Sequence, residues 1–180
     1  MRSDLLPASG TYADIPIGEV LTEAGASIPE TSLRLYAFYD AAEQAAVPTP
    51  PEERPIVLIE HALTGDGNAT DWWADMVGVG KPIDTSKYLV LCANALGGCA
   101  GSTGPGSLHP EGGFWGSRFP GLSIRDLVQA EKQLLDVLEI PRVHVVLGAS
   151  MGGARSLEWS LLYPEMMDAV LLIAVSARAS

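Results

Sequence analysis

The stretch LGASMGG, residues 147–153, constrains the fold of this chain more than any other. It follows residues 143–147 (VHVVL), which are expected to form a strand, and a helical pattern begins at Gly152. A chain that passes from strand to helix within so few residues has room only for small neighbours, and Gly148 and Gly152 meet that demand. The pattern G-x-S-x-G in this setting predicts that Ser150 stands on a sharp turn at the carboxyl end of a strand.

Such a turn is typical of a serine that acts as a nucleophile, because it lifts the Ser150 hydroxyl off the sheet and places it at a helix N-terminus. The backbone N–H of Met151 is then expected to face an oxygen anion formed on the substrate. A second N–H should come from the loop after the strand Ile56–Glu60, and by position we assign it to Leu63. In the same loop, His61 is expected to shape the backbone by hydrogen bonding rather than to catalyse. The alternative is an ordinary strand-to-helix turn that happens to contain a serine.

The rest of the sequence predicts a mostly parallel sheet with flanking helices. Residues 15–21 and 33–39 are expected to be antiparallel strands, after a frayed leader of eleven residues, and residues 45–53 a surface loop. Strands and helices then alternate, which favours a parallel sheet with helices on both faces. Strands are predicted at residues 56–60, 88–93, 143–147 and 169–175, and helices at residues 124–138, with Ser123 as N-cap and Asp126 in the first turn, and from residue 152 to about 163.

A nucleophilic serine needs a base, and on such a turn the acid and the histidine follow the serine along the chain. All three histidines precede Ser150, and His144 should lie at the opposite end of its strand. The acids after Ser150 lie on or just past the next helix, where none is well placed to orient a base. We therefore expect residues 1–180 to be the N-terminal part of a longer domain, whose triad Asp and His are not in this chain. An apolar strand left at the open edge of a sheet predicts self-association of the isolated chain.

Composition and charge exclude several classes of function. Twenty-two Asp and Glu against 11 Lys and Arg give a net charge of −11, which repels phosphate backbones and argues against a nucleic-acid partner. The longest apolar run, residues 169–175, is too short to span a membrane. With no signal peptide recognisable, Cys92 and Cys99 are expected to be reduced thiols, and the protein cytoplasmic.

Other candidate sites have weaker support. The glycine-rich residues 97–106 lack the Gly-Lys-Ser/Thr of a phosphate loop and are interpreted as shaping the floor of the active site. Cys92 is expected in the core, Cys99 in a structural role, and Arg155 at the surface or in a salt bridge. No His, Cys and carboxylate cluster has metal-ligand spacing. Four aromatic residues could exclude water from the site or simply pack beneath loops: Trp72, Trp73, Phe114 and Trp115.

Several stretches together resemble the homoserine O-acetyltransferases of methionine biosynthesis, which have the α/β-hydrolase fold. The matching stretches are EHALTGD (60–66), DWW (71–73), NALGGC (94–99), GSTGP (101–105), SIRD (123–126), GASMGG (148–153) and LEW (157–159). The variant GAR at residues 153–155 and the ending AVSARAS at residues 174–180 look like actinobacterial members.

The resemblance implies that Ser150 takes an acetyl group from acetyl-CoA and passes it to the side-chain hydroxyl of L-homoserine. Acetyl-CoA is then a substrate, and no cofactor is expected. It also implies that a catalytic Asp and His, an arginine for the homoserine carboxylate, and a helical lid that contributes to a homodimer lie in the second half of a family member. Two other functions stay open, a serine esterase of the same fold and a non-catalytic binding module of that fold. The sequence does not separate an acetyl from a succinyl donor.

Overall fold

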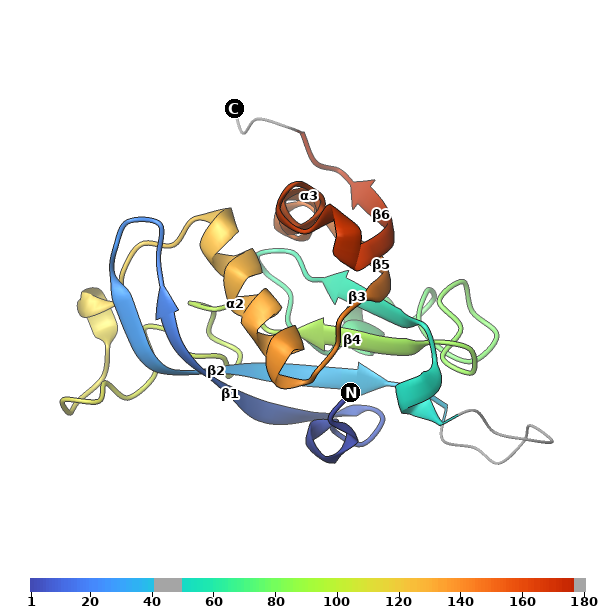
Figure 1. Ribbon diagram of the computed structural model, residues 1–180, viewed down its shortest axis with the longest axis horizontal. Helices are drawn as coiled ribbons and strands as arrows, with labels where there is room; N and C mark the ends of the chain where they lie inside the picture. The colour runs from blue at the N-terminus through green and yellow to red at the C-terminus, as the bar shows by residue number, and fades with distance from the viewer. Residues whose placement is uncertain (41–49, 177–180) are drawn as a thin grey trace.

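The fold, seen in a computed structural model that describes residues 1–40 and 50–176, is built on one mixed sheet (Figure 1). In these residues the sheet has six strands in the order β1-β2-β4-β3-β5-β6. The strands are β1 (Thr11–Leu21), β2 (Ser27–Phe38), β3 (Ile56–Glu60), β4 (Leu89–Ala93), β5 (Val143–Ala149) and β6 (Met167–Ile173). The α-helices are α1 (Ala69–Trp72), α2 (Ile124–Val137) and α3 (Met151–Leu162), and short 3-10 turns lie at Ser3–Leu5, Pro51–Glu53, Gly116–Arg118 and Pro164–Met166.

Strands β3 to β6 run parallel, whereas β1 pairs with β2, and β2 with β4, in antiparallel register. The sequences of β3 and β4, IVLIE and LVLCA, are apolar almost throughout, and every residue in both strands is buried. Uninterrupted apolar runs are what a strand covered on both faces requires. The predicted mostly parallel sheet is therefore confirmed, and the carboxyl ends of β3, β4, β5 and β6 share one edge.

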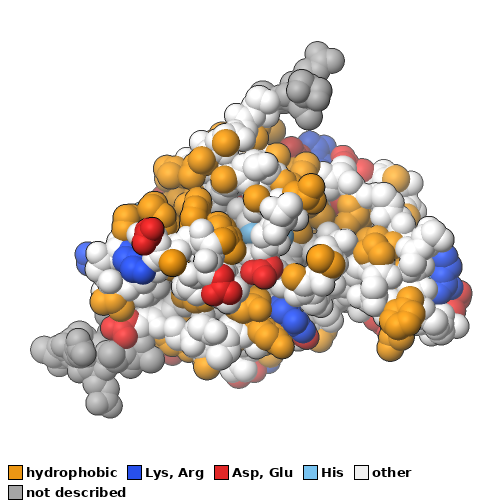
Figure 2. Space-filling model, turned by 180° about the vertical axis from the view of Figure 1, so that it is seen from behind, with side chains coloured by type: hydrophobic (Ala, Val, Ile, Leu, Met, Phe, Trp, Pro, Cys, Tyr) orange, Lys and Arg blue, Asp and Glu red, His pale blue; other side chains and the backbone are white. Residues whose placement is uncertain are grey.

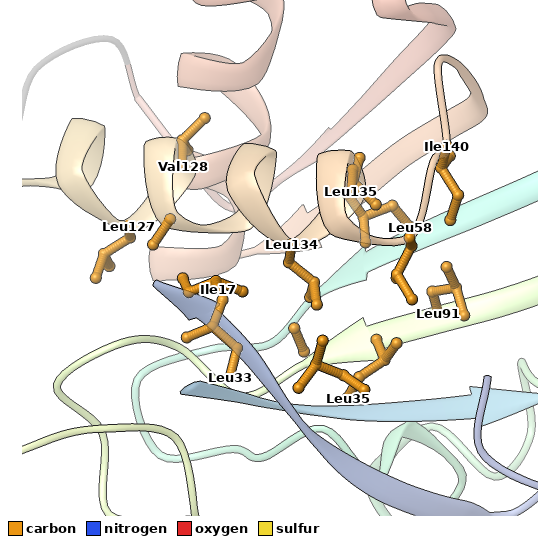
Figure 3. Packing of buried hydrophobic residues seen from close by; sticks show 14 of the residues in the cluster. Ile17, Leu33, Leu35, Leu58, Leu91, Leu127, Val128, Leu134, Leu135 and Ile140 are labelled. Carbon is orange, nitrogen blue, oxygen red and sulfur yellow. The ribbon is translucent and has the colours of Figure 1, made fainter. Parts of the chain in front are cut away.

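Helices α2 and α3 both cover the same face of the sheet, where the larger core cluster lies (Figure 3). In α2 the fully buried positions Val128, Leu134 and Leu135 recur at helical spacing and pack toward Leu58 and Leu91 of the sheet. The predicted capping of α2 is confirmed, since Ser123 Oγ accepts from Asp126 N (3.1 Å) and Asp126 Oδ2 accepts from Ser123 N (2.8 Å).

The opposite face is covered mainly by residues 69–88, whose one α-helix is the single turn α1, so the prediction of helices on both faces is only partly right. Trp72, Val77 and Ile83 pack there on β2, β3 and β4. This cover does not extend across β6, where Leu171 and its neighbours up to Ile173 are exposed. Figure 2 shows hydrophobic side chains gathered on this face near the C-terminal end of the described chain.

The prediction of a frayed leader is wrong. Leu5 and Leu6 pack against the larger core cluster, and Arg2 N donates to Leu138 O at 2.8 Å. Strand β1 begins at Thr11, four residues earlier than predicted. Of the predicted loop at residues 45–53, residues 45–49 lie outside the described residues and Pro51–Glu53 forms a 3-10 turn.

Candidate active site

Ser150 occupies the turn between β5 and α3 and has an unusual backbone conformation, φ 56° and ψ −121°. A residue other than glycine rarely adopts a positive φ, and holding its backbone in that conformation costs about 1–3 kcal/mol. Two main-chain hydrogen bonds hold the turn, from Ser150 N to Ile173 O (3.1 Å) and from Ala154 N to Ser150 O (3.0 Å). The predicted strand–turn–helix is confirmed, and Ser150 is exposed at its apex.

The glycines beside the serine are required by close backbone contacts. A Cβ on Gly148 would lie 2.5 Å from the carbonyl of Gly152 and 2.7 Å from Glu60 Cβ. A Cβ on Gly152 would overlap Glu60 O and lie 2.9 Å from His61 O. The start of α3 is therefore pressed against the last residue of β3 and the first residue of the loop that follows. This agrees with the sequence argument that only small residues fit here.

The two amides assigned to bind an oxygen anion flank this contact. Met151 is the first residue of α3, immediately before Gly152, and Leu63 lies two residues after His61. Within the part of the chain that the structure describes, neither the Met151 nor the Leu63 N–H donates to a protein acceptor. The side chain of Leu63 is exposed, and the loop is closed by a bond from Gly65 N to Ala62 O (2.9 Å). Both amides are therefore free to bind a ligand, and their role in binding an anion stays a prediction.

His61 has the structural role expected from the sequence. Its Nε2 accepts from Ala95 N (3.0 Å), and its Nδ1 is 2.8 Å from Ala62 O. An accepting Nε2 leaves the proton on Nδ1, so the ring is neutral and ties the loop after β3 to the loop after β4. Burial, with Arg155 adding to it, lowers the pKa of His61 to about 4, which favours this neutral form.

Beside Ser150 lies an open hollow of about 430 Å³. Ser150 and Met151 line it together with residues of α3 and of the segment after β6: Ala154, Leu157, Glu158, Ala174, Val175 and Ser176, with Ile124 from the start of α2. Glu158 is ion-paired with Arg125 (2.6 Å). The hollow is mixed in character, with an apolar wall and one paired carboxylate, and Leu63 does not line it.

None of the three histidines lines this hollow in the described residues. His109 Nδ1 accepts from Glu111 N (3.1 Å), and its ring packs against Trp115 at 4.3 Å between centroids. His144 pairs with Asp168 (2.9 Å) near the amino end of β5, as its place in the strand predicts. No base for Ser150 is therefore found among them.

One other prediction about the site differs from the structure. Residues 97–106 line a separate hollow of about 300 Å³ and contribute nothing to the one beside Ser150, so they do not form its floor. For the four aromatic residues the sequence left open whether they exclude water or pack beneath loops, and packing is right for three of them. Trp115 is buried, and Trp72 and Trp73 pack on the face covered by residues 69–88, with their ring centroids 5.0 Å apart. Phe114 is exposed, and none of the four lines the hollow.

Sequence reasoning placed Arg155 at the surface or in a salt bridge, and only the second alternative is right. Its side chain is 0% exposed and ion-paired with Glu60 and Glu131. A signal for burial was present, because Arg155 follows Gly152 by three residues and precedes Trp159 by four, which places all three on the inner face of α3.

Among the described residues no group of three His, Cys, Asp or Glu side chains could hold a metal ion. Cys92 is buried in β4, as predicted, and burial raises the pKa of its thiol. Cys99 is exposed. A helix long and apolar enough to cross a membrane was not found when the described residues were searched.

Comparison with known proteins gives a consistent result. The family model for the alpha/beta hydrolase fold matches residues 55–179. The chain is 96% identical over 180 residues to the homoserine O-acetyltransferase of Corynebacterium urealyticum and 64% identical over 190 residues to that of Corynebacterium jeikeium. All of this chain is covered in both alignments, but it spans only 46% and 48% of the length of those relatives.

Solved structures of similar fold include an acetylester hydrolase from Corynebacterium glutamicum and a homoserine O-acetyltransferase from Bacillus anthracis. The first matches 95% of this chain and 46% of its own with a TM-score of 0.79 and 25% identity. The second matches 89% of this chain and 45% of its own with a TM-score of 0.76 and 24% identity, which shows a shared fold.

Proposed function

This chain belongs to the alpha/beta hydrolase fold family, and from that premise we propose that it supplies the nucleophile half of a homoserine O-acetyltransferase. The observation that carries the proposal is the 96% identity, over all 180 residues, to a relative of that name. The strained turn at Ser150, with a free amide beside it, gives the proposal a physical basis.

In the proposed first step, Ser150 Oγ attacks the thioester carbonyl carbon of acetyl-CoA. The serine proton passes to a base, and the carbonyl oxygen becomes an anion that accepts hydrogen bonds from the Met151 and Leu63 amides. The carbon–sulfur bond then breaks, and the sulfur leaves as the protonated thiol of coenzyme A. The product is an acetyl ester on Ser150. Acetyl-CoA is consumed as a substrate, and no cofactor is required.

In the second step, the side-chain hydroxyl of L-homoserine attacks the acetyl-serine. Its proton goes to the base, the same amides hold the anion, and Ser150 is released as O-acetylhomoserine forms. No described histidine is placed to serve as the base. We therefore propose that the base and its orienting acid come from the part of the enzyme beyond residues 1–180, as the resemblance implies.

The proposal extends to the setting of the reaction. We place it in the cytoplasm, because both cysteines are free thiols, which suits a reducing compartment. The partners proposed are acetyl-CoA and L-homoserine, with methionine biosynthesis as the pathway and a homodimer as the assembly. Neither a nucleic acid nor a membrane surface is among them, and the net charge of −11 supports leaving out nucleic acid.

The test uses a chimera in which residues 1–180 replace the matching part of the Corynebacterium urealyticum relative. Given acetyl-CoA and L-homoserine, it should release free thiol in a homoserine-dependent manner. Ser150→Ala should lower this rate by at least about 10⁴-fold, because the covalent step is lost. Ser160→Ala is the matched control and should leave the rate unchanged, since within residues 1–40 and 50–176 this hydroxyl bonds to Leu157 O, one turn away on the same helix, and to no other group. Thiol release that does not depend on homoserine would contradict acetyl transfer to it.

A serine esterase is the second candidate, favoured by the similarity to the Corynebacterium glutamicum acetylester hydrolase. The same chimera separates the two when water and homoserine are compared as acceptors, and succinyl-CoA in place of acetyl-CoA identifies the donor. Labelling by a fluorophosphonate probe tests the third possibility, a binding module without catalysis, for which Ser150 should not react.

A further inference from the structure

A buried charge cluster joins three elements of the fold beneath the Ser150 turn. Arg155 on α3 lies 2.5 Å from Glu60 Oε2 at the end of β3 and is also ion-paired with Glu131 on α2. Trp159 Nε1 donates to the other oxygen of Glu131 at 3.1 Å. All four side chains are at least 97% buried. One arginine thus connects α3 to both β3 and α2 in a site closed to water.

This cluster is a costly way to stabilise a fold. It holds two carboxyl groups against one guanidinium, and Arg155 Nε and Nη1 and Glu60 Oε1 have no hydrogen-bond partner among the described residues. Burial raises the pKa of Glu60, as expected when a carboxylate loses water. Buried ion pairs often stabilise no more than apolar side chains of the same volume. Stability alone is therefore a poor reason for the cluster.

The position of the cluster suggests a better reason. Arg155 pulls α3 toward Glu60, one turn along from the point where Gly152 touches Glu60 O and His61 O. The Met151 amide lies on one side of that contact. The Leu63 amide, two residues after His61, lies on the other side. The distance between these amides thus depends on how closely α3 is held to the end of β3.

We propose that Arg155 is a positioning residue that sets the spacing of the Met151 and Leu63 amides by clamping α3 to Glu60. The proposal rests on the function proposed above, since it presumes that these amides bind the anion formed at Ser150. The clamp is electrostatic and directional, so a purely apolar filling of the same space should pack well and still leave the amide spacing less well fixed.

The test compares three variants of the chimera described above. Arg155→Met removes the clamp, and Arg155→Lys keeps a charge with a shorter reach. A triple variant, Arg155→Met with Glu60→Leu and Glu131→Gln, removes all the charges while keeping an acceptor for Trp159. The matched control is Arg142→Met, because Arg142 also pairs with a carboxylate but lies exposed near the amino end of β5. Each is measured by thermal unfolding, by kcat and KM, and by the rate at which a fluorophosphonate labels Ser150.

Arg155→Met should lower kcat and the labelling rate by between about 10- and 100-fold with KM for homoserine within about 2-fold, since misplacing a catalytic group by about 1 Å can cost 100-fold. The kcat and the labelling rate of Arg155→Lys should lie between those of Arg155→Met and those of the unmodified chimera. The triple variant should regain the unfolding temperature of the unmodified chimera, but its kcat and labelling rate should stay low. If the role of Arg155 were merely structural, these rates would recover together with the stability. Labelling rates equal to the unmodified chimera in Arg155→Met, or restored in the triple variant, would overturn the inference. A chimera that labels normally but transfers no acetyl group would contradict the proposed function alone, and the labelling rates would still decide the role of Arg155.

Discussion

The two edges of the parallel strands hold their ionisable side chains in opposite ways. At the carboxyl edge, Arg155 and His61 are buried, and the backbones of β3 and α3 touch. At the amino edge, Arg142 and His144 pair with Asp168, and all three side chains are between 43% and 55% exposed. The amino edge also has a hollow, of about 360 Å³, lined by these residues.

The comparison shows how the edge that carries the proposed site differs from the other edge. A histidine–aspartate pair beside a hollow is present at the amino edge, but no serine is held there in a strained backbone conformation. The carboxyl edge has no such pair among the described residues, yet it has the forced turn and the free amides. Close packing and backbone strain at Ser150 therefore distinguish the edge that carries the proposed site, whereas a hollow is present at both edges. The difference also predicts that substitutions at the carboxyl edge lower the free energy of unfolding far more than substitutions elsewhere.

The largest effect is expected for Gly152→Ala. The new methyl group would overlap Glu60 O, which is backbone and cannot move aside, so the free energy of unfolding should fall by about 3 kcal/mol or more. Gly121→Ala is the control, because a Cβ there meets nothing within 4 Å. Denaturant unfolding of both variants checks this. Equal stability of the two would show that the contact at the carboxyl edge is not tight.

A somewhat smaller effect concerns pH. The pKa of His61 is lowered to about 4 from a usual value near 6.5, so between these values the unfolded chain binds a proton that the folded chain does not. The free energy of unfolding should be highest above pH 6.5 and should fall by about 3 kcal/mol as the pH drops to 4. Unfolding measured between pH 4 and 6.5 should show that the free energy of unfolding changes with pH. His61→Gln should reduce the slope of this dependence, whereas His144→Gln at the amino edge should leave the slope in place. A slope that survives His61→Gln would contradict the assignment.

The smallest effect concerns self-association through β6, whose carboxyl half is exposed and apolar. Leu171 is 53% exposed on the outermost strand, and an open apolar edge pairs readily with another chain. Leu171→Lys should raise the dissociation constant for self-association of the 180-residue chain by about tenfold, because a lysine at an edge opposes pairing. Leu21→Lys, at an exposed leucine of the other outermost strand, is the control. Sedimentation measures both, and a monomeric unmodified chain would contradict the expectation.

Much of the site could be predicted from the sequence because its causes are local. Gly148 must be small partly because a Cβ there would meet the carbonyl of Gly152, four residues on, and Ser123 caps α2 through a residue three positions away. The further contacts of Gly148 and Gly152 with Glu60 and His61 are not local and were seen only in the structure. The role of His61 could also be predicted from the sequence, which placed it in the loop after a buried strand, where it bonds to the backbone of Ala95 and Ala62.

The packed N-terminus and the position of the loop at residues 97–106 were not predicted, because both depend on contacts with distant segments. The loop, for example, is held on β2 by bonds from Thr103 N to Ser32 O and from Arg34 N to Ser102 Oγ, both 2.9 Å.

The sequence by itself determined that a serine would be forced into a strand-to-helix turn, since steric demands between adjacent residues can be read from the order of side chains. Only the tertiary structure decided that Arg155 is enclosed between Glu60 and Glu131. Those partners lie 95 and 24 residues away in the chain. The free energy of a buried charge depends on which groups surround it, and folding alone brings those groups together.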